Sequence, residues 1–491
     1  MTPHIKRWLT LILLAAMIGL TACTSVGPDY RIPDQAMVKN PAATGKLAAA
    51  GEAAYSSAAL PTDWWRLYRD PQLDQLIGKA LQANPDIRAA ASHLRIAREA
   101  MEAAERERLP QVGFDAAPGY GRPSAVQMGL PFTLPDSGNY DAGISVAYQI
   151  DLFGKLTREE QAVAADAGAV QATYEAARIS VVAGTAGAYA DICSLTHQQQ
   201  VLEKQIALQE QYLKLVADRV RLGRGSALDN TKAGAQLLQL QAQRPAWVAK
   251  QKLARYQLAA LLGEVPGHSP SADELTCRQA PQLTSAIPVG DGQALMQRRP
   301  DIRQAERKLA GASARIGVAT AELYPHIKFG ASVGSTGLLS GFGAGDAFRW
   351  EIGPLMTWSL PATNQARIHI RQAQAGTDEA LAHFDATVLN ALRETESALT
   401  VYARTLDHHQ NLEKITRQDE LLLHQTETLF RYGRADFLNV LESRRAILNN
   451  DAAIAASEAA LAADQIHLFL ALGGGWQENI AEKSTQTGDP K

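Results

Sequence analysis

RPDIRQAERKLAGASARIGVATAELYPHIKF, at residues 299–329, is a second version of NPDIRAAASHLRIAREAMEAAERERLPQVGF, at residues 84–114. Within these stretches Pro85 and Pro300 are 215 residues apart, and so are Phe114 and Phe329. Beyond them the offset is 210 residues, because Leu222-Gly223-Arg224 matches Tyr432-Gly433-Arg434 and Leu262-Gly263 matches Leu472-Gly473. The change in offset predicts a surface loop after the two phenylalanines. The chain thus contains an internal repeat, and we expect its two halves to have the same fold.

The composition favours long helices. Of the 491 residues 46% are apolar but only 6% are aromatic, which is unlike the core of a sandwich or an α/β domain. The formal net charge of −3 leaves no basic surface for nucleic acid. No run of about 18 apolar residues follows the N-terminus, so we expect no membrane-spanning helix in the mature chain.

Proline-free runs indicate how long the helices are. Residues 155–222 and 365–432 contain no proline, and each would extend about 100 Å as a helix, which exceeds any globular core. The helices that follow, at 226–262 and 436–472, would extend about 55 Å. Pro245 lies inside the helix at 226–262, so we expect a kink or break just before it.

Four short segments alternate apolar with polar or small residues, at 111–121, 139–150, 326–336 and 348–360. This alternation, with aromatic residues near the ends, is typical of membrane strands with one face to lipid and one to a polar lumen. A soluble hairpin would alternate too, but the long helices favour a membrane barrel. Four strands do not close a barrel, and open strand edges are not tolerated in lipid. Several chains must contribute, and three copies would give twelve strands.

The N-terminus has the features of a bacterial secretory signal. A short basic region at residues 4–7 precedes an apolar stretch at 8–20 and the sequence LTAC, which ends at Cys23. LTAC matches a lipobox, in which cleavage leaves the cysteine as an acylated first residue; the alternative is an ordinary signal with an incidental cysteine. Thr24 follows where inner-membrane retention would favour Asp. We therefore expect a signal peptide at 1–22 and an outer-membrane lipoprotein anchored through Cys23.

The remaining divisions follow the repeat. Residues 23–61, rich in Ala, Gly, Ser and Pro, should form an extended strap or flexible linker. The two repeats are expected at 62–264 and 296–473. Residues 265–295 between them are expected in an equatorial belt around the helices, and 474–491 form a C-terminal tail.

The chain resembles the outer-membrane factor family, of the TolC, OprM and NodT type. The resemblance rests on CTSVGPDYRIP from Cys23, DWWRLYRDPQLDQLIGKALQANPDIRAA from Asp63, DLFGK from Asp151, the second PDIR stretch, LFRYGRADFLNVLESRRAIL from Leu429 and ALGGGW from Ala471. It covers nearly the whole mature chain. It implies a homotrimer that forms a twelve-stranded outer-membrane β-barrel, four strands per chain, continued by a long periplasmic α-helical barrel.

The resemblance also implies a function. The channel would be a passive duct for drugs or other small toxic compounds, which an inner-membrane pump of RND or MFS type passes on through a periplasmic adaptor protein. It would lie in the outer membrane, in contact with lipid. Two alternatives stay open: a duct for type I protein secretion, and a structural coiled-coil lipoprotein that braces the envelope.

The sequence does not indicate an enzyme, a cofactor or a metal site. GFGAGDAF, at residues 341–348, is followed by an alternating strand and lacks a lysine for phosphate, which favours a turn between strands. His408 and His409 are adjacent and therefore lie on different parts of a helix surface, and the residues four positions later are Leu412 and Glu413, which does not indicate a zinc site.

Two equivalent turns connect the long helices at the expected periplasmic tip. Ser226 and Asp436 stand at N-cap positions, and Asp229 and Asn439 lie three residues later. The simplest role of Asp229 is a capping box with Ser226.

The resemblance adds a gate at this tip. The family closes its channel with an apolar ring and an acidic ring from the second repeat, and these positions fall on Leu438 and Glu442, which share one helix face. Three Glu442 carboxylates around a threefold axis would repel one another and attract cations. The alternative for Glu442 is a surface ion pair with Arg444 or Arg445.

Two cysteines remain once Cys23 is acylated. Cys193 lies halfway along the first long helix and Cys277 lies between the repeats, so both are expected in the equatorial belt and in the oxidising periplasm. We expect a Cys193–Cys277 disulfide; the alternative is a small buried cysteine and an unrelated surface thiol.

Overall fold

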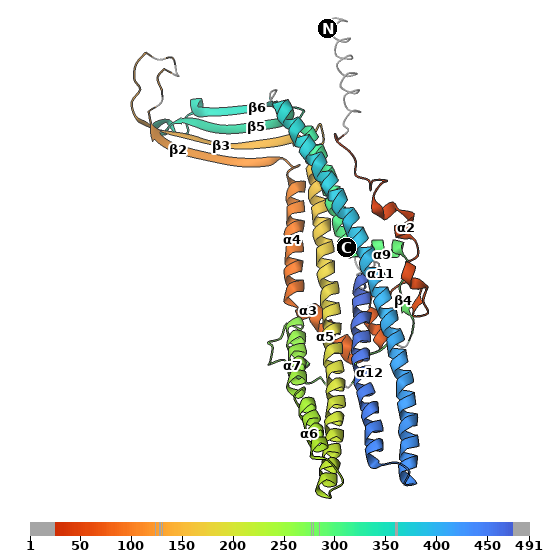
Figure 1. Ribbon diagram of the computed structural model, residues 1–491. Helices are drawn as coiled ribbons and strands as arrows, with labels where there is room; N and C mark the ends of the chain where they lie inside the picture. Colours follow the sequence, from red (N-terminus) through yellow and green to blue (C-terminus); the bar gives the residue numbers. More distant parts are fainter. Residues whose placement is uncertain are drawn as a thin grey trace, which may run out of the picture. The chain divides into compact units, whose positions relative to one another are not determined.

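The computed structural model describes residues 25–474, apart from 123, 127–128, 130, 276, 278, 284 and 359–361. Its longer helices are α3 (Pro71–Ala83), α4 (Pro85–Arg106), α5 (Lys155–Arg221), α6 (Ala227–Gln241), α7 (Arg244–Leu261), α10 (Pro300–Ala321), α11 (Ala362–Arg431) and α12 (Phe437–Ala471). The short helices are α2 (Pro41–Thr44), α8 (Pro270–Asp273) and α9 (Gly292–Arg298). The strands are β1 (Tyr55–Ser56), β2 (Gln111–Gly121), β3 (Ser137–Ile150), β4 (Ile287–Pro288), β5 (His326–Leu338) and β6 (Phe348–Thr357). Figure 1 labels most of these elements.

The chain forms two compact units, and both repeats contribute equivalent segments to each. The first unit contains the residues up to Pro33, His93–Gln171 and Gln304–Phe384. The second contains Asp34–Ser92, Ala172–Arg303 and the residues from Asp385 onwards. The repeat in the sequence is therefore also a repeat in the structure.

The first unit holds a four-stranded antiparallel sheet in the order β2-β3-β5-β6 (Figure 1). The strand register places apolar residues opposite one another across all four strands, as in the row Phe114, Ile144, Val333 and Trp350. The next row on this face contains Val112, Val146, Ala331 and Ile352. Phe114 is 74% exposed and Trp350 69% exposed, so within one chain this apolar face is uncovered.

The opposite face of the sheet is small and polar. One row across it contains Gly113, Ser145, Ser332 and Glu351, and the neighbouring row contains Asp115, Gly143, Gly334 and Arg349. Within the described residues β2 and β6 each have a neighbouring strand on one side only. The expected strands are present; β6 ends at Thr357, and residues 359–360 of the expected strand lie outside the described residues.

The segment before residue 61 is ordered and makes specific contacts, so the flexible-linker alternative is wrong for its described part. In the first unit Arg158 donates hydrogen bonds to the carbonyl oxygens of Val26 (3.0 Å) and Gly27 (3.1 Å). Gly27 has a φ of +86°, and a Cβ there would lie 2.4 Å from the Cα of Gly317, so only glycine fits. In the second unit β1 pairs in parallel with β4 from the segment between the repeats.

An aromatic cluster lies in the core of the second unit. Trp64, from the 3-10 turn Trp64–Tyr68, is 1% exposed and stacks on Phe469 of α12 with a ring-centroid distance of 4.5 Å. The Tyr68 hydroxyl donates to the Gln465 side chain at 3.1 Å. The N-terminal part of the chain is thereby packed against the last helix.

The two repeats share one junction, where the helix that begins PDIR meets the end of the returning helix. In the first repeat the Asn84 side chain donates to the carbonyl oxygen of Leu261 at 3.0 Å. In the second, Arg299 donates to the carbonyl oxygen of Ala471 at 2.8 Å. Leu261 and Ala471 are equivalent residues at the helix C-termini, where carbonyl groups lack partners within the helix.

The break expected near Pro245 is present. The predicted single helix at 226–262 is two helices, because α6 ends at Gln241 and α7 begins at Arg244 with Pro245 in its first turn. Proline is tolerated there, since the first turn does not need its N–H. In the second repeat α12 continues through Ala455, the residue equivalent to Pro245.

Helix α5 has an 18-residue window apolar enough to cross a membrane, but 67% of that window is buried within the protein. A helix so largely covered by other parts of its own chain is typical of a protein core. The window is therefore weak evidence for a membrane span.

The junction predicts the effect of a substitution at Gly263. This glycine follows α7 with a φ of +70°, and a Cβ added to it would lie 2.7 Å from the carbonyl oxygen of Ala83. Gly263→Ala should lower the free energy of unfolding by about 1–3 kcal/mol, since it adds left-handed strain and a steric clash. Gly78→Ala is the control, because Gly78 lies inside α3 with nothing within 4 Å of its missing Cβ. Equal unfolding midpoints for both variants would contradict this account of the junction.

Candidate functional site

The candidate site lies in the second unit, where two tight turns connect α5 to α6 and α11 to α12. Both turns use a glycine with positive φ, Gly223 at +67° and Gly433 at +69°. The next residue, Arg224 or Arg434, donates its backbone N–H to a carbonyl five residues earlier, at 2.8 Å in each turn. Both are Schellman motifs, which explains why the two repeats share glycine at this point.

Side chains cap the helices that leave these turns. The Ser226 hydroxyl accepts from the backbone N–H of Leu228 at 3.1 Å, and the Asp436 carboxylate accepts from that of Leu438 at 3.5 Å. Both expected N-caps are confirmed. The backbone N–H of Asp229 donates to the carbonyl oxygen of Ser226 at 3.0 Å. Among the described residues no hydrogen bond joins the Ser226 N–H to the Asp229 carboxylate, so the structure does not form the capping box expected from the sequence.

An ion pair joins the two turns within one chain. Arg219, near the end of α5, lies 2.5 Å from the carboxylate of Asp436. The hydrogen bond from Arg219 lowers the pKa of Asp436 below its ordinary value. Sequence reasoning missed this pair, although the repeat offers a signal: Leu429 is equivalent to Arg219 and Ser226 to Asp436, so each charge occurs in one repeat only.

A groove of about 490 Å³ lies beside this ion pair. Leu438 of α12 and Asp229 of α6 both line it, so the structure brings together two of the four residues expected at the gate. Arg224 and Lys232 add positive charge to the same groove. Asn439 is exposed.

Glu442 stands one helical turn after Leu438 and is exposed. The structure does not pair it with Arg444, which lies 2.9 Å from Glu427 of α11. Arg445 lines a different pocket, together with Gln205 and Leu441. Within the described part of the chain the Glu442 carboxylate has no ion-pair partner, which leaves it available to other groups.

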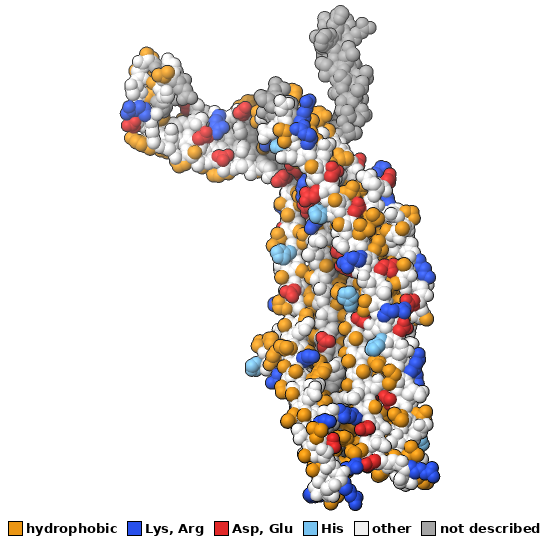
Figure 2. Space-filling model, in the orientation of Figure 1, with side chains coloured by type: hydrophobic (Ala, Val, Ile, Leu, Met, Phe, Trp, Pro, Cys, Tyr) orange, Lys and Arg blue, Asp and Glu red, His pale blue; other side chains and the backbone are white. Residues whose placement is uncertain are grey.

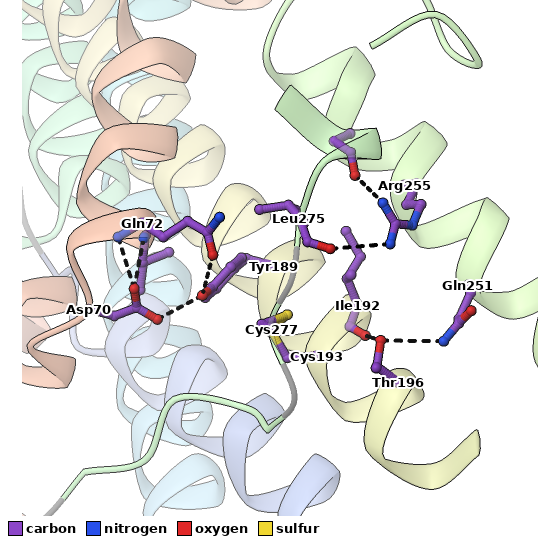
Figure 3. Close-up of a disulfide and its surroundings, with 12 residues drawn as sticks. Asp70, Gln72, Tyr189, Ile192, Cys193, Thr196, Gln251, Arg255, Leu275 and Cys277 are labelled. Atoms are coloured by element: carbon purple, nitrogen blue, oxygen red, sulfur yellow. Dashed lines mark hydrogen bonds between the residues drawn. A yellow bond between two sulfur atoms is a disulfide. The ribbon is translucent and has the colours of Figure 1, made fainter. Parts of the chain in front are cut away.

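The structure joins Cys193 to Cys277, with their sulfurs 2.01 Å apart and their Cα atoms 5.1 Å apart (Figure 3). Cys193 is fully buried in α5. Arg255 of α7 holds the same segment by donating to the carbonyl oxygens of Ala272 and Leu275. One turn before Cys193, the Tyr189 hydroxyl donates to Asp70 at 2.8 Å.

The expected lipidation site, Cys23, lies outside the described residues, but the chain is described from Ser25 onwards. Ser25 packs against Gly154, where a Cβ would approach the Ser25 side chain to 2.5 Å. Gly154 lies between the end of β3 and the start of α5. The chain thus emerges two residues after Cys23 at the junction of sheet and helix.

Comparison with known proteins shows which family the chain resembles. The family model described as outer membrane efflux protein matches residues 76–264 and 292–474, one match per repeat. Outer membrane protein OprJ of Pseudomonas aeruginosa is 27% identical over 94% of this chain and 96% of its own length. The toluene efflux pump outer membrane protein TtgF of Pseudomonas putida is 26% identical over 96% of this chain and 97% of its own.

The fold agrees with solved structures. The outer-membrane channel OprN superposes with a TM-score of 0.84 at 31% identity, over 93% of this chain and all of that one. The Campylobacter jejuni outer membrane channel CmeC shares the fold, with a TM-score of 0.81 at 19% identity. The chain therefore belongs to the outer membrane efflux protein family, and it is an outer-membrane channel of an efflux system with a periplasmic helical extension.

Proposed function

We propose that three copies of this chain close one twelve-stranded barrel and export drugs or other small toxic compounds. The single observation that carries the proposal is the sheet, with an exposed apolar face, a polar face and two free edges. Free backbone groups at an edge are costly in hydrocarbon, and pairing β6 of one copy with β2 of the next removes every edge. The apolar rows then face lipid and the polar rows face the lumen.

The proposed cargo follows from the names of the relatives. The proposed partners follow because a passive duct depends on other proteins for energy. TtgF is named as part of a toluene efflux pump, which supports small apolar compounds as cargo. The described residues contain no group of three or more His, Cys, Asp or Glu side chains that could hold a metal ion. An inner-membrane pump of RND or MFS type and a periplasmic adaptor would supply energy and selectivity.

The gate of this duct is proposed at Leu438 and Glu442. The contacts support it: Leu438 lines the groove beside the Arg219–Asp436 ion pair, and Glu442 is exposed and unpaired among the described residues. In a threefold assembly the three Glu442 carboxylates would attract cations, and the Leu438 side chains would narrow the lumen and resist wetting. Asp229 and Asn439 would flank these rings.

The anchor is proposed at Cys23. Ser25 contacts Gly154 in the connection between β3 and α5, so an acyl chain on Cys23 would start within about 7 Å of Ser25. The lipid would aid assembly, and the barrel would hold the protein in the membrane.

Opening the proposed gate should raise the resting conductance. Leu438→Ala with Glu442→Ala removes both rings, and we expect a several-fold rise in single-channel conductance in planar bilayers and entry of large antibiotics such as vancomycin. The matched control is Leu228→Ala with Lys232→Ala, at the equivalent positions of the first repeat. Wild-type conductance in the first variant, inserted as a trimer, would refute the gate; an equal rise in the control would refute its assignment to the second repeat.

Acylation is tested separately from transport. Cells that express the wild-type chain should incorporate radiolabelled palmitate into it, and Cys23→Ser should abolish the label while the protein still inserts through its barrel. An unlabelled wild-type chain would show that Cys23 is not a lipidation site.

The disulfide is tested by thiol counting. In mature protein that is denatured without reduction, we expect no thiol to react with maleimide at Cys193 or Cys277, because the periplasm is oxidising. After reduction two thiols per chain should react. Two reactive thiols before reduction would exclude the bond in the cell.

A further inference from the structure

The two hairpins of the sheet have the same register. In the first hairpin β2 pairs with β3, and Gln111 lies opposite Ala147. The 215-residue offset between β2 and β5 and the 210-residue offset between β3 and β6 convert this pair into His326 and Thr357. These two residues lie opposite each other in the second hairpin, where β5 pairs with β6. The offsets of the repeat therefore give the strand register of this sheet to the residue.

The same offsets apply to the pairing between hairpins. Within the chain β3 of the first repeat pairs with β5 of the second. The equivalent pairing joins β6 of a second repeat to β2 of a first repeat. One chain does not form it, because β2 and β6 are the outer strands of its sheet and lie three strand spacings apart, about 14 Å. A second copy must supply the partner strand, and this pairing of β6 with the next copy's β2 is called the seam below.

A pair of glycines marks the equivalent position in both pairings. In the pairing of β3 with β5, Gly143 lies opposite Gly334, and a Cβ on Gly334 would lie 2.5 Å from the carbonyl oxygen of Ala142. The offsets convert this pair into Gly353 of one copy and Gly119 of the next. The strands at the seam can therefore approach as closely as the strands inside the chain.

Gly353 has no evident purpose within a single chain. It lies inside β6, where glycine weakens a strand because it contributes no side chain to packing. A Cβ added to it would have nothing within 4 Å among the described residues. Close approach of a neighbouring backbone is a common reason for glycine in a strand, and the seam supplies such a backbone.

The converted register also keeps the two faces of the sheet separate. It places Ile352 opposite Tyr120 of the next copy on the apolar face, where they are 59% and 80% exposed in the single chain. It places Leu355 opposite Ala117 on the other face. A register shifted by one residue would bring side chains of opposite faces together, so only shifts of two residues remain as alternatives.

Two prolines lie on the strands of the seam. Pro118 of β2 and Pro354 of β6 have no N–H to donate to a neighbouring strand. The converted register places them opposite each other, as Val333 and Ile144 are in the pairing of β3 with β5. The missing donors are then confined to one position of each seam.

We infer that β6 of one copy pairs antiparallel with β2 of the next in the register that places Gly353 opposite Gly119, Leu355 opposite Ala117 and Thr357 opposite Asp115. The inference rests on the proposed three-copy barrel and adds the residues that meet in it. The pairing between copies then repeats the pairing between hairpins within each copy.

Oxidative cross-linking of the full-length protein in outer membranes tests this register. Leu355→Cys with Ala117→Cys, and Thr357→Cys with Asp115→Cys, each place two thiols opposite each other with Cβ atoms about 5 Å apart. Copper phenanthroline should convert most of each double variant into covalent trimers on a denaturing gel without reductant, because every chain is joined to both neighbours. The wild-type chain and the single variants should give no covalent trimer.

The same four cysteines provide the controls. Leu355→Cys with Asp115→Cys, and Thr357→Cys with Ala117→Cys, shift the register by two residues in opposite directions, and their Cβ atoms would lie about 7 Å apart. Both should cross-link several-fold more slowly. Faster cross-linking of either shifted pair would overturn the register and leave the three-copy barrel intact. If none of the four pairs gives covalent trimers in protein that migrates as a trimer on a native gel, β6 does not meet β2, and the proposed barrel falls as well.

Discussion

Backbone amide and carbonyl groups in hydrocarbon have no water to bond, and this constraint governs the sheet of the first unit. One chain supplies only β2, β3, β5 and β6, and both outer strands keep a free edge within the described residues. One face of the sheet carries rows of aromatic and aliphatic residues, and the other carries rows of glycine, serine and carboxylate residues. Two such faces suit a wall between lipid and water. Such a wall is complete only when copies of the chain share it, so the membrane part of the proposed channel is inherently oligomeric.

The helices depend on a different requirement, the satisfaction of carbonyl groups at helix ends. Asn84 and Arg299 differ in size and charge, yet each donates to the equivalent carbonyl, of Leu261 or Ala471. Gly263 and Gly473 follow these helices with positive φ, and their lack of a Cβ lets Ala83 and Arg299, which precede α4 and α10, approach closely. The junction is thus preserved by geometry, and its side chains are free to diverge. That freedom allows the second repeat to carry Arg298 where the first has Ala83.

The tip shows the same combination of shared backbone and divergent side chains. Both turns are Schellman motifs, but Arg219 occurs in one repeat and Asp436 in the other, and the two meet at 2.5 Å. A threefold channel built from such chains has six turns of two kinds around its axis. In such a channel the two kinds of turn would alternate around the axis and differ in charge, unlike a sixfold ring of identical turns.

The sequence by itself determined the repeat, the four strands, the helix lengths and the break at Pro245, because periodicity, proline and glycine act locally. It also placed Leu438 and Glu442 on one helix face, since residues four apart share a face. It did not determine the Arg219–Asp436 pair, the loss of the Asp229 capping box or the contacts of residues 25–61. These join residues far apart in the chain, as Arg158 does with Val26 and Gly27. Only the tertiary structure decided them, because a charge or a carbonyl selects its partner by distance in space and the sequence does not record that distance.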